Sequence, residues 1–245
     1  MSFCASPLIL QSAVIPLRRK SLTGHLKPIL WCLLGVVVFA DGCSQGSKTR
    51  FRLVNAVVDE SDLSIVEDGN NVSNNLAYAT STGYLSAHAG SHQIQIEPSG
   101  TSNVFLTQTV NFSSGTDTTI LPFNFSSSPE SLVLVDDNSA PPSGDAKLRL
   151  INVAPSSGPT DVYVVAPGTD INTVSPTITN LAFGAASSYQ NLTAANYEII
   201  YAFAGQKSIA IDSGSLSLSS GQIRSFVGLN GQSGGFTDVL LPDVN

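Results

Sequence analysis

The sequence predicts an all-β protein: two tandem immunoglobulin-like/transthyretin-like antiparallel β-sandwich domains that follow an N-terminal signal segment. Three observations lead to this prediction. First, 42% of the 245 residues are apolar and only 12% are charged, which excludes the charge-rich composition of disordered chains. Second, the apolar residues fall in short blocks separated by Gly, Asn, Ser or Pro, which is a strand-and-turn pattern. Third, seven of these blocks recur in the same order further along the chain.

The first 43 residues have the pattern of a signal peptide. Four basic residues between Arg18 and Lys27 precede a run of twelve uncharged residues, 29–40. A transmembrane helix needs about 20 apolar residues, whereas the apolar core of a signal peptide has roughly 7–15. We therefore predict that residues 1–43 are an export signal.

The apolar run ends at Ala40-Asp41-Gly42-Cys43, which is similar to a bacterial lipobox. The Gly-Cys junction predicts lipidation of Cys43 and attachment to the membrane through an N-terminal lipid. Asp41 is unusual in such a site, so cleavage by ordinary signal peptidase is the alternative. Residues 44–50 are small and polar and are expected to form a flexible tether. We expect a cell-envelope location, as an outer-membrane lipoprotein or a periplasmic protein, with secretion as the alternative.

The internal repeat divides the rest of the chain into two copies, 51–138 and 146–245, joined by a linker at 139–145. Phe51-Arg52-Leu53-Val54-Asn55-Ala56 opens the first copy and Leu148-Arg149-Leu150-Ile151-Asn152-Val153 the second. The offset between matching blocks grows from 97 to 107 residues, as insertions in loops of the second copy would produce. No stretch has sustained helical spacing, so at most a short helical turn is expected. Period-two alternation predicts that the following residues point inward: Ile94, Ile96, Tyr197, Ile199 and Tyr201.

Charge and cysteine content narrow the function classes. Of 18 acidic and 11 basic residues, 17 acids and 7 bases lie beyond position 43, which gives that part a formal charge of −10. Such an acidic body argues against nucleic acid as a partner, because phosphate contacts need clusters of Lys and Arg. All three cysteines, Cys4, Cys32 and Cys43, lie in the first 43 residues. The copies therefore contain neither a disulfide nor a thiolate metal site.

These motifs resemble a family of bacterial envelope domains catalogued as domain of unknown function number 4397. The resemblance covers nearly all of residues 50–243 and implies tandem β-sandwich modules of the kind found on lipoproteins and other cell-surface proteins. The chain departs from the family pattern at Ala194-Ala195-Asn196, where Ala-Gly is expected. The family motifs are structural, so they imply a fold and a location without an activity. The matching segments are Leu53-Val54-Asn55-Ala56, Asn75-Leu76-Ala77-Tyr78, Tyr84-Leu85, Ala89-Gly90-Ser91-His92-Gln93-Ile94, Arg149-Leu150-Ile151-Asn152-Val153-Ala154-Pro155 and Asp161-Val162-Tyr163-Val164.

Histidines and acidic residues give two candidate metal sites. Ala89-Gly90 separates His88 from His92 and predicts a turn, and neither histidine has an acidic neighbour in the sequence. We therefore do not expect a zinc site. Calcium prefers oxygen ligands in loops, but the oxygen-bearing residues here lack the spacing of a calcium loop. Solvated turns are the simpler interpretation, and weak calcium binding in 59–71 stays open. The oxygen-bearing residues are Asp59, Asp62, Asp68, Asn70 and Asn71.

The remaining candidate catalytic or ligand-binding residues are predicted to lie in turns, in a hairpin or in packed positions. Ser156-Ser157-Gly158 and Ser219-Ser220-Gly221 are predicted to be turns, and no Gly-x-Ser-x-Gly elbow is present. The Gly-rich segment 228–235 is predicted to be a hairpin before the last strand, because no helix pattern and no Lys follow it. Tyrosines that recur at repeat positions are expected to pack in the core or across strands.

The sequence therefore favours a non-catalytic cell-envelope lipoprotein module that serves as a spacer, adhesion or assembly element. We expect no catalytic residues, no cofactor and no bound metal. The partners would be the membrane, through lipidated Cys43, and an envelope protein or glycan. One alternative is a surface protein that binds a glycan or small ligand through loops. A second alternative is a hydrolase with a loop-borne site.

Overall fold

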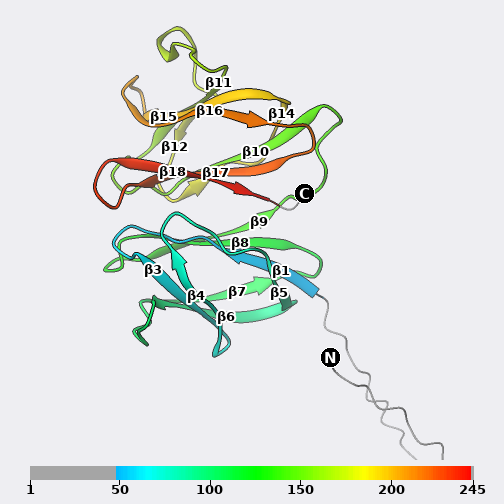
Figure 1. Cartoon of the computed structure of the whole chain (residues 1–245), viewed down its shortest axis with the longest axis vertical. Helices are drawn as coiled ribbons and strands as arrows, with labels where there is room; N and C mark the ends of the chain where they lie inside the picture. Colours follow the sequence, from blue (N-terminus) through cyan, green and yellow to red (C-terminus); the bar gives the residue numbers. More distant parts are fainter. Residues whose placement is uncertain (1–47, 244–245) are drawn as a thin grey trace, which may run out of the picture. The chain divides into compact units, whose positions relative to one another are not determined.

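The computed structural model describes residues 48–243, and these residues form β-strands joined by turns (Figure 1). The predicted signal 1–43, its lipidation site Cys43 and residues 44–47 of the predicted tether lie outside the described residues. Within 48–243, no helix has the length and apolar content that crossing a membrane requires. The predicted all-β fold class is confirmed.

The first copy consists of two sheets. One has the order β5-β1-β8-β9, with β2 pairing to β8 in the same register as β1. The other has the order β4-β3-β6-β7. The strands are β1 (Lys48–Leu53), β2 (Ala56–Val57), β3 (Asp62–Glu67), β4 (Asn70–Ala77), β5 (Leu85–His88), β6 (Gly90–Pro98), β7 (Leu106–Phe112), β8 (Asp117–Asn124) and β9 (Glu130–Asp136).

The second copy repeats this topology, which confirms the tandem repeat. One sheet has the order β14-β10-β17-β18, with β13 also pairing to β10, and the other has the order β12-β11-β15-β16. The predicted short helical turn is η1 (Ile171–Thr173), a 3₁₀ turn capped by the Asp170 side chain. The strands are β10 (Asp145–Asn152), β11 (Thr160–Val165), β12 (Ile178–Leu181), β13 (Ala185–Ala186), β14 (Gln190–Thr193), β15 (Ala195–Phe203), β16 (Ile209–Leu218), β17 (Ile223–Asn230) and β18 (Phe236–Pro242).

The sheets depart from a purely antiparallel sandwich at one place in each copy. β1 and β2 run parallel to β8, and β10 runs parallel to β17. Parallel neighbours need a crossover connection, and here the chain crosses to the opposite sheet and returns before it forms β8 or β17. Period-two alternation defines which face of the sheet a side chain occupies. It does not define the direction of a strand relative to its neighbour, so the sequence pattern could not distinguish parallel from antiparallel pairing.

Two strands begin earlier than the predicted boundaries. β1 includes residues 48–50 of the predicted tether, and β10 begins at Asp145 in the predicted linker. Thr49 is only 3% exposed and donates a hydrogen bond to the carbonyl oxygen of Thr116 at 2.6 Å. β1 also pairs with β5 from Lys48 onward. Alternation between exposed and buried residues extends back to Thr49, which is buried. The sequence did not reveal it because the residues of this segment are polar.

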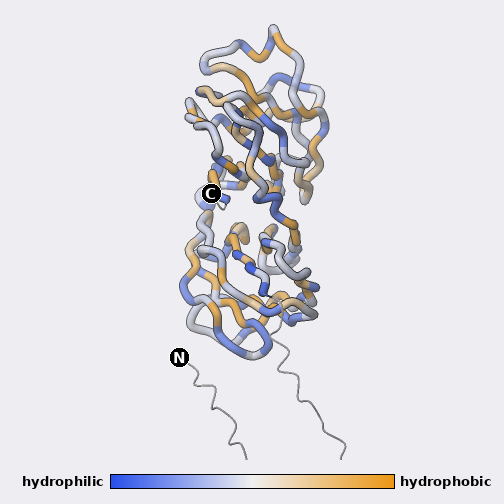
Figure 2. Tube along the Cα trace, turned by 90° about the vertical axis from the view of Figure 1, so that its right-hand side faces the viewer, coloured by the Kyte–Doolittle hydropathy of each residue, from blue (hydrophilic) through white to orange (hydrophobic). Residues whose placement is uncertain are grey.

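Each copy encloses its own apolar core between its two sheets. The predicted inward residues Ile94, Ile96, Ile199 and Tyr201 are buried there, and Tyr197 packs against the second core. Figure 2 shows apolar and polar segments interspersed along the chain in both copies. The first core also includes Phe51, Leu53, Leu63, Ile65 and Phe112, and the second includes Leu148, Leu150, Val162 and Phe226.

A third apolar cluster joins the two copies. It lies where the sheet of β1, β8 and β9 faces the sheet of β10, β17 and β18 (Figure 1). Side chains alternate along a strand, so the neighbours of core residues point to this junction. The two facing sheets are therefore buried on both sides over part of their length. The first copy contributes Val54, Ala56, Leu121 and Phe123, and the second contributes Ile151, Val153, Val227, Leu229 and Leu241.

Candidate functional site

Two arginines are buried at the junction, one from the first long strand of each copy. Arg52 follows the core residue Phe51 in β1, and Arg149 follows the core residue Leu148 in β10. Alternation therefore directs both guanidinium groups away from their own core and toward the other copy. Their residues are 1% and 3% exposed. Buried charges need partners, because an isolated ion in a protein interior is very costly.

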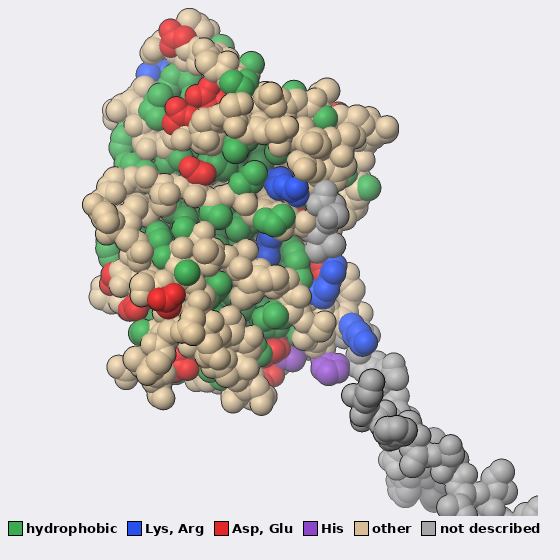
Figure 3. Space-filling model, in the orientation of Figure 1, with side chains coloured by type: hydrophobic (Ala, Val, Ile, Leu, Met, Phe, Trp, Pro, Cys, Tyr) green, Lys and Arg blue, Asp and Glu red, His purple; other side chains and the backbone are tan. Residues whose placement is uncertain are grey.

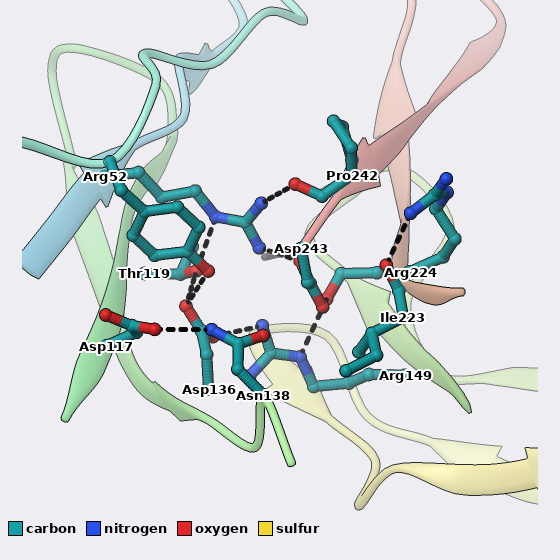
Figure 4. Close-up of polar contacts among 12 residues, drawn as sticks. Arg52, Asp117, Thr119, Asp136, Asn138, Arg149, Ile223, Arg224, Pro242 and Asp243 are labelled. Carbon is teal, nitrogen blue, oxygen red and sulfur yellow. Dashed lines mark hydrogen bonds and ion pairs between the residues drawn. The ribbon is translucent and has the colours of Figure 1, made fainter. Parts of the chain in front are cut away.

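Each arginine pairs with an aspartate of the opposite copy (Figure 4). Arg52 Nη2 forms an ion pair with Asp243 Oδ1, just beyond β18. Arg149 Nη2 lies 2.6 Å from Asp136 Oδ1, at the end of β9. Each Nη1 also donates to a backbone carbonyl of the opposite copy, at 2.8 Å for Arg52 and 3.4 Å for Arg149. The contacts are reciprocal, because each copy supplies one arginine and one aspartate.

The first carboxylate is held by hydroxyl groups of its own copy. Asp136 Oδ2 accepts hydrogen bonds from Tyr84 OH at 2.6 Å and from Thr119 Oγ1 at 2.7 Å. The Thr119 hydroxyl in turn accepts from Arg52 Nε at 2.8 Å. Thr119 thus connects the arginine of the first copy to the ion pair that Arg149 makes with Asp136.

The second carboxylate has an equivalent set of partners. Asp243 Oδ2 accepts from Tyr189 OH at 2.7 Å and from Ser225 Oγ at 3.0 Å. Ser225 Oγ accepts from Arg149 Nε at 3.1 Å. Both carboxylates therefore have partners on both oxygens, and each receives three hydrogen bonds or ion-pair contacts. We call the residues Arg52, Tyr84, Thr119, Asp136, Arg149, Tyr189, Ser225 and Asp243 the ionic junction.

The tyrosines also stack against the arginines. The guanidinium carbon of Arg52 lies 4.9 Å from the centroid of the Tyr84 ring, and that of Arg149 lies 4.6 Å from the Tyr189 ring. Burial alone would lower the pKa of Arg52, but Asp243 and Tyr84, with Asp136, outweigh burial and raise it. Burial raises the pKa of Tyr84 and of Tyr189 far above the usual value, so both hydroxyls stay protonated and can donate.

Two further contacts cross the junction from the repeated Asn-Leu-Ala-Tyr and Asn-Leu-Ala-Phe segments. Tyr78 OH of the first copy donates to the carbonyl oxygen of Asn230 at 2.5 Å, and burial raises the Tyr78 pKa to about 12. Phe183 of the second copy meets Phe123 edge to face, with centroids 5.3 Å apart. The equivalent side chain of each copy thus reaches into the other.

The ionic junction is suited to holding the copies together. A general acid or base needs a proton-transfer partner in the substrate within hydrogen-bond reach, and both oxygens of Asp136 and of Asp243 already have partners. Sequence reasoning missed this site, although a signal was present. Arg52 and Arg149 recur at an offset of 97, and Asp136 and Asp243 recur at 107. Charged residues that repeat within apolar blocks point to a buried polar contact.

A second polar cluster lies at the rim of the first sandwich. His92 Nδ1 in β6 lies 2.8 Å from Asp68 Oδ2 and 3.1 Å from Glu67 Oε1. Figure 3 shows histidines (purple) beside acidic side chains (red) near the start of the described chain. His92 has no acidic neighbour in the sequence, because 24 residues separate it from Asp68. His88 lines one cavity together with Glu67, Asp68 and His92.

The aspartates considered as calcium ligands are not brought together. Asp59 accepts from the backbone N and the hydroxyl of Ser126, at 2.7 and 2.9 Å, and Asp62 accepts from the hydroxyl of Ser61 at 3.0 Å. Asp68 instead faces His92. Across residues 48–243, the one group of three His, Cys, Asp or Glu side chains within metal-binding distance is Glu67, Asp68 and His92.

The remaining candidates lie in structural positions. The serine-rich turns 156–158 and 219–221 connect β10 to β11 and β16 to β17, and 231–235 is the hairpin between β17 and β18, as predicted. All six tyrosines are buried or half-buried. Four of them donate to residues outside the apolar cores: Tyr78, Tyr84, Tyr189 and Tyr197.

The fold is similar to several solved structures, at low sequence identity and low TM-score. A family 26 carbohydrate-binding module from Eubacterium rectale, solved with maltoheptaose, is 10% identical, with 81% of this chain and 98% of that chain covered and a TM-score of 0.25. A family 41 carbohydrate-binding module from streptococcal virulence factors is 11% identical over 73% and 93% of the two chains, at a TM-score of 0.23. A candidate adhesin from Bacteroides ovatus is 9% identical over 81% and 94%, at 0.24. At these TM-scores none of the three carries a function to this chain.

None of the curated proteins matches this sequence. One family model does match, over residues 49–163, which run from β1 through the whole first copy and the linker to Tyr163 in β11. The model describes a domain of unknown function, DUF4397. The resemblance seen in the repeated motifs is therefore confirmed over residues 49–163, which match the DUF4397 family model.

Proposed function

We propose that this protein is a non-catalytic module of the cell envelope, in which two fused β-sandwiches form one rigid body held at the membrane by a lipid on Cys43. The observation that carries the proposal is the ionic junction together with the apolar cluster around it. A spacer or assembly element must keep its two ends at a constant distance and orientation. A buried reciprocal contact between the copies supports that role.

Separating the copies would be costly for two reasons. It would expose the apolar junction residues, at a cost of about 25 cal/mol per Å², and it would break two buried ion pairs in one step. The linker adds a restraint, because Lys147 Nζ donates to Asp137 Oδ2 at 2.7 Å and to Ser139 Oγ at 2.8 Å. These contacts support a joint without independent motion of the two copies.

The distance from the anchor to the first copy is short. Four residues, 44–47, separate Cys43 from β1, and a fully extended chain with five steps between Cα atoms spans at most roughly 18 Å. A lipid on Cys43 would therefore hold the first copy close to the membrane and leave the second copy for contact with a partner.

Cell fractionation tests the anchor. We expect wild-type protein in the membrane fraction and the Cys43→Ala variant in the soluble or secreted fraction. The Cys32→Ser variant is the matched control and should remain in the membrane fraction. Retention of Cys43→Ala in the membrane fraction would show that another segment anchors the chain.

Spin-label distances test the rigid body. Thr107 in β7 and Ser217 in β16 are exposed and lie in different copies, so cysteines can be placed there in a Cys4→Ser, Cys32→Ser background. We expect a single narrow distance distribution for the membrane-extracted protein. A broad distribution would rule out a rigid spacer and favour a flexible two-domain adhesin.

A further inference from the structure

His92 is oriented by contacts on its ring. The ring lies against Phe112, with centroids 5.3 Å apart, and Nε2 lies 3.0 Å from the carbonyl oxygen of His88. A carbonyl oxygen only accepts hydrogen bonds, so Nε2 carries a proton and Nδ1 is the nitrogen that faces the two carboxylates. Metal-binding histidines are commonly held in this way, with one N–H on a backbone carbonyl and the other nitrogen on the metal.

Glu67 and Asp68 are fixed by the backbone around them. Glu67 ends β3, and its side chain is 14% exposed. Asp68 and Gly69 have positive φ values of 48° and 80°, the geometry of a two-residue type I′ hairpin. Asp68 Oδ1 accepts from the backbone N of Gln93 at 2.8 Å, which leaves Oδ2 directed at His92.

We propose that Glu67, Asp68 and His92 bind a divalent cation of the zinc class at the rim of the first sandwich. Their ligand atoms lie within 4.8 Å of one another. Ligands of a tetrahedral ion with bonds of about 2.0–2.2 Å are roughly 3.4 Å apart, so the present separations of 2.8 and 3.1 Å need only small side-chain rotations. A bound cation would take the place of the proton that Nδ1 donates to the carboxylates, and that proton would be released to solvent. The two carboxylates and the neutral imidazole then carry a charge of −2, which a divalent cation balances.

The donor set selects the kind of ion. Imidazole nitrogen suits zinc and its first-row neighbours, whereas calcium takes six to eight oxygen ligands. A cavity of about 210 Å³ opens onto these three residues. It leaves room for water or a ligand side chain at the remaining coordination positions, and His88 lines its wall.

The site belongs to the first copy alone. Tyr197 stands in the second copy at the register position of His92. The strand neighbour of Ile199 is Val164, whereas the corresponding neighbour of Ile94 is Glu67. Aromatic and aliphatic side chains therefore occupy the rim where the first copy has charged ones. The repeat itself does not require these three residues, which favours a role specific to the first copy.

Zinc titration by calorimetry tests the proposal on the full chain, purified in detergent and stripped with a chelator. We expect saturable binding of one Zn²⁺ per chain and no comparable binding of Ca²⁺. Loss of an outer-shell partner weakens metal affinity by about 10–100-fold, so losing a ligand in His92→Gln or Glu67→Gln should cost at least about 100-fold. Asp59→Asn is the matched control, because Asp59 bonds to Ser126 and lies outside the cluster. It should leave the affinity unchanged.

Circular dichroism and thermal unfolding in chelator show whether each variant is folded. Imidazole nitrogen spectra provide an independent readout in the wild-type chain, in which zinc should shift Nδ1 of His92 and leave its Nε2 protonated. The proposal is overturned if wild-type protein shows no saturable zinc binding, or if folded His92→Gln binds zinc as tightly as wild type. Loss of binding in Asp59→Asn alone would assign the ion to the 59–71 loop instead.

Discussion

The two copies agree at the junction and differ at their rims. Arg52 and Arg149 make matching contacts. At the rim, the first copy has His92 where the second has Tyr197. The comparison separates the residues that both copies share from the residues that one copy has alone. Residues repeated in both copies hold the structure together, and residues that occur once are the better candidates for a specific activity.

The last strands of the two copies show the same contrast. In β9, Val133 and Val135 are 38% and 66% exposed on the face that turns away from the junction. In β18, Leu240 corresponds to Val133, and it packs against the second core. Both strands nevertheless direct alternate residues, Leu132 and Val239 among them, into the junction cluster. The junction face is therefore shared, whereas the opposite face differs between the copies.

Removing one arginine should have the largest effect on stability. Arg52→Ala and Arg149→Ala each leave a buried aspartate without its cation, which costs about 3–5 kcal/mol. If the copies are equivalent here, the two losses should be equal within about 1 kcal/mol. Arg50→Ala is the comparison, because Arg50 is 45% exposed in its ion pair with Asp117 and should lose less stability than either junction arginine. Denaturant unfolding measures all three, and a loss in Arg52→Ala as small as that in Arg50→Ala would contradict the proposed role of the junction.

Removing one tyrosine hydroxyl should have the next largest effect. In Tyr84→Phe and Tyr189→Phe the carboxylate loses one donor while the ring stays over the arginine. A hydrogen bond to a charged group contributes about 1.5–3 kcal/mol, and we expect that loss of unfolding free energy in either variant. Tyr197→Phe is the control, because its hydroxyl donates to an exposed backbone carbonyl at 2.8 Å. Equal losses in all three variants would show that the junction hydroxyls have no special role.

Replacing the repeated asparagines should cause smaller losses of stability, and these losses should differ between the copies. Asn55 Nδ2 donates to the carbonyl oxygen of Leu76 at 3.0 Å, and Asn152 Nδ2 donates to that of Leu181 at 3.2 Å. Both residues are fully buried, so replacement by Ala should cost about 1–3 kcal/mol each by leaving backbone groups unpaired. Asn152 makes more contacts and should cost more. Thermal unfolding checks the order, with exposed Asn191→Ala as the control.

The linker pair should give the smallest effect. Lys147 and the Ser139 hydroxyl lower the pKa of Asp137 to about 2, below the unfolded value of about 3.9. The stabilisation is therefore present above about pH 4 and is lost as the pH falls toward 2. Asp137 is exposed, so its contribution should be only about 0–1 kcal/mol. Unfolding measured from pH 6 to pH 2 should show a slightly shallower loss for Asp137→Asn than for wild type. Identical pH profiles for Asp137→Asn and wild type would show that the Lys147–Asp137 pair does not stabilise the linker.

Sequence reasoning found the faces of the strands better than their partners. Alternation placed Ile94 and Ile199 in the cores, and the ordered blocks predicted the tandem repeat. The same alternation places Arg52 on the face opposite Phe51, but it contains no information about what covers that face. Only the packing of the two copies against each other shows that the face is buried and that Asp243 is the partner.

The rim cluster was hidden for a related reason. Asp68 and His92 are 24 residues apart, and they meet because β3 and β6 are neighbours in a particular register. A pattern of apolar residues predicts that a strand exists without identifying its neighbour. Polar residues gathered from different strands are therefore visible only after strand order and register are known.

The reciprocal junction also has an evolutionary meaning. When residue i of one half contacts residue j of the other, and j of the first contacts i of the second, the contact is that of a two-fold symmetric dimer. Here both halves lie on one polypeptide, which is the product expected when the gene of a homodimer is duplicated and fused. In a homodimer every substitution is made twice, at both symmetry-related positions. After fusion each half can change alone, and the two halves here differ at the rim, where the first has His92 and the second has Tyr197.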